Sequence, residues 1–297
     1  MDTRILENAS LRAEFLPEFG GRMARLLFKG PPGGQREVLQ PYVQTSFDAL
    51  AWPKCGMYPL APYSNRIRDA RLPFAGQVHV LPPHPAASPH TLHGCAHTLA
   101  WRVSAQDPRL LEMDVHYTGP HWPWPLYCRQ RVVIGDGWLE CTLEVRNLNA
   151  TRSMPVGGGL HPFLSADGLR EMCFVAGRRW QHDAQCLPDG LSTPLLGGQR
   201  WSPSMADEAE QLGYFSQWDG QMQLQYDQGI LQLSAGQGLS HLVMFIPRGA
   251  PYVCVEPVSH LANAFAMPQL DPRDSGVALA APGQSVRYTM RLAWQPN

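Results

Sequence analysis

Glu256 ends an apolar run and is the acidic residue best placed in this sequence to act as a base. It follows Tyr252-Val253-Cys254-Val255 and precedes Pro257. A carboxylate in such surroundings is costly to bury unless it is paired or used in chemistry. Because desolvation raises the pKa of a carboxyl group, Glu256 would suit general base catalysis. A strand-end glutamate that reaches water is the alternative, and the run alone does not decide between the two.

His161 follows three consecutive glycines, 157–159, and lies between Leu160 and Pro162. Consecutive glycines cost chain entropy, so they indicate a close approach of the backbone or unusual dihedral angles. No Gly-Lys-Ser/Thr follows them, which excludes a P-loop. The flanking residues would hold the imidazole stiffly, and a rigid, partly buried histidine can serve as acid or base near neutral pH.

Asn65 and Arg66 lie in a stretch, Ala61-Pro62-Tyr63-Ser64-Asn65-Arg66-Ile67, whose Pro, Ser and Asn favour an irregular loop. Together they offer several hydrogen-bond donors in fixed geometry, which suits recognition of hydroxyl or carboxylate groups. An arginine that makes a structural ion pair is the alternative, and from spacing alone the more common one.

His90, His93 and His97 are close enough in sequence to raise the question of a metal site. In an extended segment His90 and His93 point to opposite faces, so we expect no joint ligation and no metal. His93 stands beside Gly94, which fits a ligand lying close to the backbone. For an isolated histidine, a structural role is the more common alternative.

The composition limits the class of protein. The chain has 297 residues, 44% of them hydrophobic, and a formal net charge of -1, so we expect one domain over residues 1–297 and no binding to nucleic acid or membranes. We expect no signal peptide, because the N-terminal residues lack an apolar stretch. The seven cysteines are odd in number and lack zinc spacing, which favours free thiols in a reducing cytoplasm.

Strand patterns dominate the rest of the chain, and no long amphipathic helix is predicted. Alternating or apolar runs predict strands at 115–117, 129–134, 138–145, 222–226, 230–234, 242–246 and 286–293. Turn residues separate them at 135–137, 218–220, 227–229 and 281–283, and the first of these predicts a hairpin. Short helical turns are expected near 204–212, and a Pro-rich surface loop at 80–89. Many short strands at close spacing predict an all-β, large antiparallel sandwich.

These pieces, taken in order, resemble the aldose 1-epimerase (galactose mutarotase-like) family over nearly the whole chain. The matching motifs are Phe19-Gly20-Gly21-Arg22-Met23-Ala24-Arg25-Leu26, Ser64-Asn65-Arg66-Ile67, Leu72-Pro73-Phe74-Ala75-Gly76, Leu92-His93-Gly94, Gly159-Leu160-His161-Pro162-Phe163, Cys254-Val255-Glu256-Pro257 and Ala281-Pro282-Gly283-Gln284-Ser285. Each is weak alone, and their order is specific. Cys95-Ala96-His97-Thr98 stands where the galactose enzymes have a second Gly and an aromatic-rich segment, so the chain looks closer to a compact bacterial branch.

The resemblance implies a galactose-mutarotase-like β-sandwich, or supersandwich, with an open sugar cleft. It implies Glu256 as catalytic base and His161 as catalytic acid. Arg66 and His93 would contact the sugar. Asp219 in Gln217-Trp218-Asp219-Gly220 is the loosest match, to an aspartate that binds sugar hydroxyls, and a turn residue is the equal alternative. Asn65 would bind substrate or shape the loop.

The implied activity is interconversion of the α and β anomers of an aldose by acid–base ring opening, with no cofactor. The expected partner is a monosaccharide, and the chain would be a monomer or a homodimer. A hexose-6-phosphate mutarotase is one alternative, for which Arg66, Arg68 and Arg71 would supply an anion pocket; extended backbone would let at most two of them converge. A non-catalytic carbohydrate-binding protein is another, and it has no need for both Glu256 and His161. A glycosidase would need two carboxylates.

Overall fold

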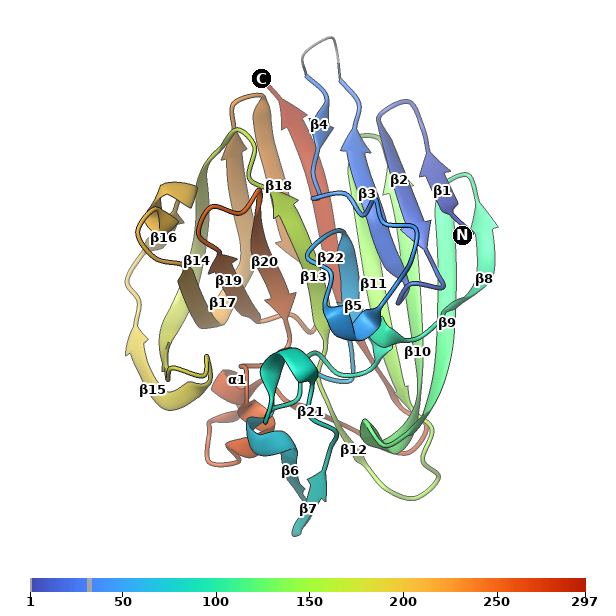
Figure 1. The fold of residues 1–297 in the computed structure, drawn as a ribbon, viewed down its shortest axis with the longest axis vertical. Coiled ribbons are helices and arrows are strands. Elements are labelled where there is room, and N and C mark those ends of the chain that lie inside the picture. Colours follow the sequence, from blue (N-terminus) through green and yellow to red (C-terminus); the bar gives the residue numbers. More distant parts are fainter. Residues whose placement is uncertain (1, 31–33) are drawn as a thin grey trace.

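Strands make up most of the chain, as its alternating patterns predict. The computed structural model describes residues 2–30 and 34–297 (Figure 1). Within these residues the helical content is one short α-helix, α1 (Pro272–Ser275), and six single 3-10 turns. No helix in the described ranges is long and apolar enough to cross a membrane.

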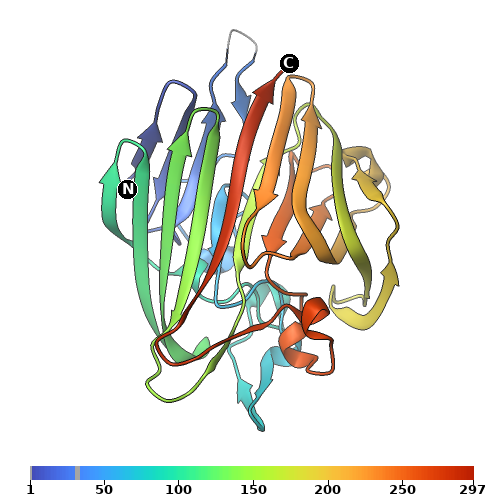
Figure 2. The ribbon, with the colours of Figure 1, turned by 180° about the vertical axis from the view of Figure 1, so that it is seen from behind.

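One layer of the sandwich is a row of antiparallel strands, which lies in front in Figure 2. In spatial order these strands are β8 (Arg102–Asp107), β9 (Leu110–Gly119), β10 (Trp122–Gly135), β11 (Trp138–Asn147), β22 (Ser285–Pro296) and β18 (Gly229–Ala235). The Gly-Asp-Gly hairpin is confirmed, since Gly135 of β10 pairs with Trp138 of β11. All seven predicted strands lie inside observed ones.

The second layer carries the candidate site. Its neighbouring strands are β1 (Arg4–Glu7), β2 (Leu11–Leu16), β3 (Arg22–Phe28), β5 (Met57–Leu60), β13 (Gly159–Ser165), β20 (Tyr252–Val258) and β19 (His241–Ile246), with β4 (Arg36–Glu37) beside β3. Strands far apart in the sequence are therefore direct neighbours here, and β13 lies between β5 and β20.

Two long strands join the layers. The first part of β17 (Gln211–Tyr226) pairs with β19 and its last part with β18, so this strand belongs to both layers. It also pairs with β14 (Leu169–His182), which carries β15 (Pro188–Pro194) and β16 (Gly198–Trp201). The turn predicted at 218–220 is wrong as a strand boundary. Instead, β17 bends there and changes partner, with positive φ at Gln217 and Gly220.

The main core lies between the layers, and β20 in the second layer is buried on both faces. Val253 and Val255 of β20 join the large cluster that also holds Leu139 and Leu143 of β11. Their neighbour Cys254 joins a smaller cluster on the opposite face, with Tyr58, Phe163, Tyr214 and Val258. Alternate residues of a strand face opposite ways, so burial on both faces explains why the run before Glu256 is apolar throughout.

Short elements and loops complete the fold. They comprise β6 (Arg71–Phe74) with β7 (Gln77–Val80), β12 (Met154–Val156) with β21 (Ala278–Ala280), and the 3-10 turns η1 (Ala49–Ala51), η2 (Arg68–Ala70), η3 (Pro85–Ala87), η4 (Ala96–Thr98), η5 (Pro203–Ala206) and η6 (Ala264–Ala266). The loop expected at 80–89 is confirmed and includes η3. The helical turn expected near 204–212 is shorter than predicted, because β17 already begins at Gln211.

Candidate active site

A row of side chains crosses the second layer and forms the floor of a cavity. His161 pairs with Tyr58 of β5 on one side. On the other side, the register that pairs Gly159 with Val258 and Phe163 with Cys254 places His161 opposite Glu256. Glu256 pairs with Val243, and Val243 with Tyr214. Paired residues of neighbouring strands share a face, so the floor runs Tyr58, His161, Glu256, Val243, Tyr214.

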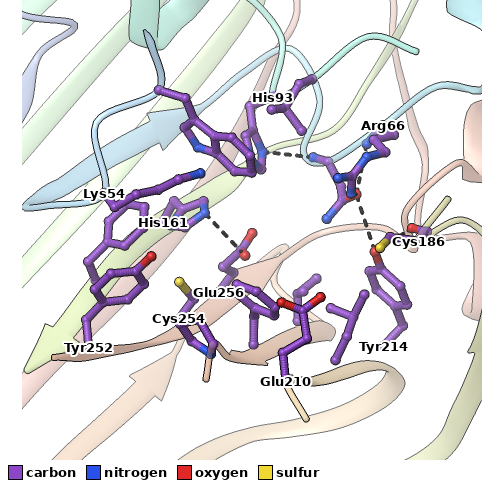
Figure 3. A pocket seen from close by; sticks show the side chains of 18 residues that line it. Lys54, Arg66, His93, His161, Cys186, Glu210, Tyr214, Tyr252, Cys254 and Glu256 are labelled. Atoms are coloured by element: carbon purple, nitrogen blue, oxygen red, sulfur yellow. Dashed lines mark hydrogen bonds and ion pairs between the residues drawn. The ribbon is translucent and has the colours of Figure 1, made fainter. Parts of the chain in front are cut away.

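The cavity has a volume of about 340 Å³ and is lined by side chains from both the sheet and the loops (Figure 3). The lining residues are Trp52, Lys54, Asn65, Arg66, Leu92, His93, His161, Phe163, Cys186, Glu210, Leu212, Tyr214, Val243, Phe245, Pro247, Tyr252, Cys254 and Glu256. Its size is at the small end for ligand pockets, and its lining is apolar with a few polar groups, as is usual for sites that take small molecules.

His161 and Glu256 form a buried acid–base pair. His161 Nε2 lies 3.3 Å from Glu256 Oε1, and the two residues are 2% and 4% exposed. His161 Nδ1 and Glu256 Oε2 have no hydrogen-bond partner among the described residues. Burial raises the pKa of Glu256 to about 8, against the smaller opposing effects of Arg66 and Lys54. Burial also holds the pKa of His161 well below its usual value, and the nearby cation Lys54 adds to this.

Aromatic rings fix the orientation of His161. Its imidazole stacks on Tyr58, with ring centroids 4.8 Å apart, and on Phe163 at 4.5 Å. The ring of His93 meets it edge-on at 5.0 Å. Tyr58 is itself held by a hydrogen bond from Trp52 Nε1 to its hydroxyl oxygen, 2.9 Å long. The stiffness expected for His161 thus comes from packed rings as well as from its neighbours in sequence.

The three glycines before His161 bring backbone and side chains close together. A Cβ on Gly159 would lie 2.4 Å from the carbonyl oxygen of Pro257, and one on Gly158 would lie 2.6 Å from the ring of Tyr288. None of the three has a positive φ. Close approach, and not an unusual backbone conformation, is therefore the reason for these glycines.

Two loop segments lie side by side and carry the remaining predicted residues. The N–H of His93 donates to the carbonyl of Asn65, and the N–H of Cys95 donates to that of Ala61. Gly94 is required between them, because its φ is +68° and a Cβ there would lie 2.3 Å from the Ala61 carbonyl oxygen. The segment from His90 to His93 is not extended, and His93 itself has a positive φ. The extended backbone assumed for the histidines is therefore wrong.

Hydrogen bonds within these loops orient the side chains of His93, Asn65 and Arg66, which line the cavity. His93 Nδ1 accepts from the backbone N–H of Asn65 at 3.1 Å, which leaves the proton on Nε2 and makes that atom a donor. Asn65 Oδ1 accepts from Arg66 Nη1 at 3.4 Å and from Tyr214 at 3.5 Å. Asn65 therefore holds Arg66 and Tyr214 in place as well as lining the cavity.

The structure brings together five of the six residues predicted for the site: Glu256, His161, Arg66, His93 and Asn65 all line this cavity. Asp219 does not. It is exposed at the bend of β17, where its carboxylate accepts from the N–H of Gln221, and it lines a separate surface hollow. His90 lies outside the cavity and accepts from the N–H of Asp69.

Several cavity residues were not predicted from the sequence. Glu210, just before β17, is an exposed carboxylate in the lining, where Asp219 had been expected. Lys54 comes from the segment after η1, and Tyr214 from β17. None of these belongs to a motif, so no signal in the sequence singles them out.

The arrangement can move protons to and from a small polar ligand. A buried carboxyl and imidazole in contact can exchange a proton, Arg66 and His93 can donate to ligand oxygens, and Glu210 can accept from hydroxyl groups. No group of three or more His, Cys, Asp or Glu in the described ranges is arranged to hold a metal ion.

Comparison with known proteins identifies the family to which the sequence is similar. Residues 4–211 match the model of the aldose 1-epimerase family. An uncharacterized protein of Escherichia coli K12, YphB, is 23% identical over 251 residues, which are 80% of this chain and 83% of that protein.

Solved structures share the fold. A galactose mutarotase-like protein of Clostridium acetobutylicum superposes with a TM-score of 0.82 at 18% identity, over 99% of this chain and 95% of that one. A GalM/aldose epimerase homologue from C. elegans gives 0.81 at 15% identity, over 99% of each chain. The family match includes Arg66, His93 and His161. On this evidence the chain belongs to the aldose 1-epimerase family.

Proposed function

We propose that the protein is a mutarotase that interconverts the α and β anomers of an aldose. The observation that carries this proposal is the buried contact between Glu256 and His161 on the floor of a small cavity. A carboxyl and an imidazole with desolvated, displaced pKa values are the groups that acid–base catalysis uses. Membership of the aldose 1-epimerase family supports the same activity.

In this mechanism Glu256 removes the proton of the C1 hydroxyl while His161 protonates the ring oxygen, and the ring opens to the aldehyde. Rotation about the C1–C2 bond then presents the other face of the carbonyl group. Reclosure returns both protons, so the pair ends in its starting state. Each transfer contributes a rate factor of roughly 10²–10⁴. No electrons are exchanged with a cofactor and no group is transferred.

The other cavity residues hold the sugar. Arg66 and the Nε2–H of His93 donate to sugar oxygens and favour negative charge that develops on them. Glu210 accepts from hydroxyl groups in the role first considered for Asp219. The rings of Trp52 and Phe163 add apolar surface to the cavity lining for the C–H side of the sugar.

The hydrolytic alternative fits the cavity less well. A glycosidase needs two carboxylates on either side of the bond that is cleaved. Glu256 is engaged with His161, and the other cavity carboxylate, Glu210, is exposed.

Exchange spectroscopy by NMR tests the proposal directly. Purified protein is added to equilibrated aldoses, and the rate of α–β exchange is compared with that of buffer alone. We expect faster exchange for at least one common aldose without any addition. Tight sugar binding with no acceleration for any aldose would instead identify a carbohydrate-binding protein.

A further inference from the structure

Lys54 differs from the other lysine of the chain in its surroundings. The chain has 24 basic residues, and the printed sequence shows that only Lys29 and Lys54 among them are lysines. Lys29 lies at the surface and pairs with Glu7 at 2.6 Å. Lys54 lines the cavity, half-buried, and forms no ion pair with any described residue. The protein thus has one ordinary lysine and one lysine inside its candidate active site.

The side chain of Lys54 lies in the same cavity as the acid–base pair. Its amino group lies over the indole of Trp52, whose ring nitrogen donates to Tyr58, the residue stacked on His161. In Figure 3 its amino group points into the cavity towards His161. Among charged neighbours, Lys54 has the largest effect on the pKa of His161, and it also acts on Glu256.

The surroundings of Lys54 increase the fraction of its free amine. Burial lowers the pKa of Lys54 from 10.5 to about 8; the cation Arg66 acts in the same direction, while Cys254 and Glu256 oppose it. Such a change raises the unprotonated fraction at neutral pH by roughly 300-fold relative to an ordinary lysine. Desolvation and a neighbouring cation are the conditions that make lysines into nucleophiles for carbonyl compounds.

We propose that Lys54 captures the open-chain aldehyde of the substrate as a reversible Schiff base. This inference rests on the proposed mutarotase function, because ring opening produces an aldehyde at C1 within the same cavity. Glu256 and His161 act on the C1 hydroxyl and the ring oxygen, so C1 must lie beside this pair, and Lys54 is the amine that faces it.

The step balances without any further reagent. The lone pair of Lys54 Nζ attacks C1 and the C=O π bond breaks; the carbonyl oxygen takes a proton from the Glu256–His161 pair while the nitrogen gives one up to the pair, which leaves a neutral carbinolamine. The pair then protonates the carbinolamine hydroxyl, water leaves with the C–O bond, the C=N bond forms, and the remaining nitrogen proton returns to the pair. Addition of water reverses each step and returns the aldehyde and the amine. Rotation about C1–C2 is possible in the imine as in the aldehyde, so capture is compatible with turnover.

Reductive trapping tests the proposal, with Lys29 as an internal control. The protein is treated at pH 7 with sodium cyanoborohydride and glycolaldehyde, a hydroxyaldehyde too short to close a ring, and labelled lysines are located by peptide mass spectrometry. We expect Lys54 to be labelled at least about tenfold faster than Lys29, because more of its amine is unprotonated. Lys29→Arg should keep the fast labelling and Lys54→Arg should lose it. Equal labelling of the two lysines, or faster labelling of Lys29, would overturn the proposal.

A second experiment distinguishes a failure of this inference from a failure of the proposed function. The same trapping is done with an aldose, and α–β exchange is measured on the same sample. Exchange together with selective aldose labelling of Lys54 supports both ideas. Exchange with no excess label on Lys54 from either probe contradicts the Schiff base and leaves the mutarotase intact. Fast glycolaldehyde labelling of Lys54 without exchange of any aldose leaves Lys54 as an amine nucleophile and removes the mutarotase.

Discussion

At the scale of single residues, Glu256 has its displaced pKa because two neighbouring strands place it beside His161 in a desolvated cavity. We predict that Glu256→Gln lowers the rate of anomer exchange by about 10²-fold or more, because the amide cannot accept the proton of the C1 hydroxyl. The side chain keeps its shape and removes a buried ionisable group, so the melting temperature should not fall. Glu210→Gln, which changes the exposed carboxylate of the same cavity, is the matched control and should mainly raise KM. Near-normal turnover in a folded Glu256→Gln protein would refute the assignment of the base.

The pH dependence follows from the contact between the two groups. Burial raises the pKa of Glu256 to about 8 and lowers that of His161 well below 6.5, so between these limits the pair holds one proton. The form with Glu256 ionised and His161 protonated belongs to this one-proton state. We therefore expect kcat to be flat around neutral pH and to fall above about pH 8, where the shared proton is lost and no acid remains.

Lys54 has a pKa in the same range, so the alkaline limb needs its own control. Lys54→Met should retain the fall in kcat if the fall belongs to the acid–base pair. Loss of the fall in that variant would assign it to Lys54. A rate that rises through pH 8 in the unaltered protein would contradict the shared-proton description.

At the scale of elements, the contact between β13 and β20 sets the distance between His161 and Glu256. We predict that Gly159→Ala destabilises the fold by about 1–3 kcal/mol, because its Cβ would meet the Pro257 carbonyl oxygen at 2.4 Å and must push the strands apart. The same displacement would separate His161 from Glu256 and lower anomer exchange. Urea unfolding and exchange spectroscopy measure the two effects.

Gly198→Ala is the matched control for this change. Gly198 is also a strand glycine, and its nearest neighbour to an added Cβ is a carbonyl oxygen 3.9 Å away. Both its stability and its activity should stay close to those of the unaltered protein. Gly159→Ala with unchanged stability and turnover would show that the strand contact does not control the pair.

At the scale of the whole molecule, the charge distribution bears on the choice of substrate. The net charge is close to zero, so no long-range field gathers anions. Of the arginines considered for a phosphate pocket, Arg68 pairs with Asp183 at 2.7 Å and Arg71 is exposed on β6, outside the cavity lining. Arg66 is left without a second arginine beside it.

We therefore expect kcat/KM to be higher for glucose or galactose than for the matching 6-phosphate at fixed ionic strength. A tenfold preference for the phosphate, equal to about 1.4 kcal/mol, would overturn this expectation. If Lys54→Met then removed that preference, the anion site would lie at Lys54. If Arg68→Ala removed it, the pair with Asp183 would have to open on binding.

The sequence by itself determined the local features of this protein. The alternation in 138–145 and the Gly-Asp-Gly turn predicted β11 and its hairpin with β10, because the two faces of a strand and the geometry of a tight turn act within a few residues. The motifs around Arg66, His93, His161 and Glu256 also identified residues that line one cavity, because their order along the chain resembles that of a known family although each motif is weak alone.

Only the tertiary structure decided which side chains meet. Glu256 and His161 face each other because of the register between β20 and β13, and that register is fixed by hydrogen bonds and packing across strands that are distant in sequence. For the same reason Lys54 and Glu210 could not be found in advance: what makes them functional candidates is the cavity around them. Asp219 lies outside the cavity, at the bend where β17 changes its partner from β19 to β18, so its loose motif match did not place it correctly, and only the pairing of these strands reveals this.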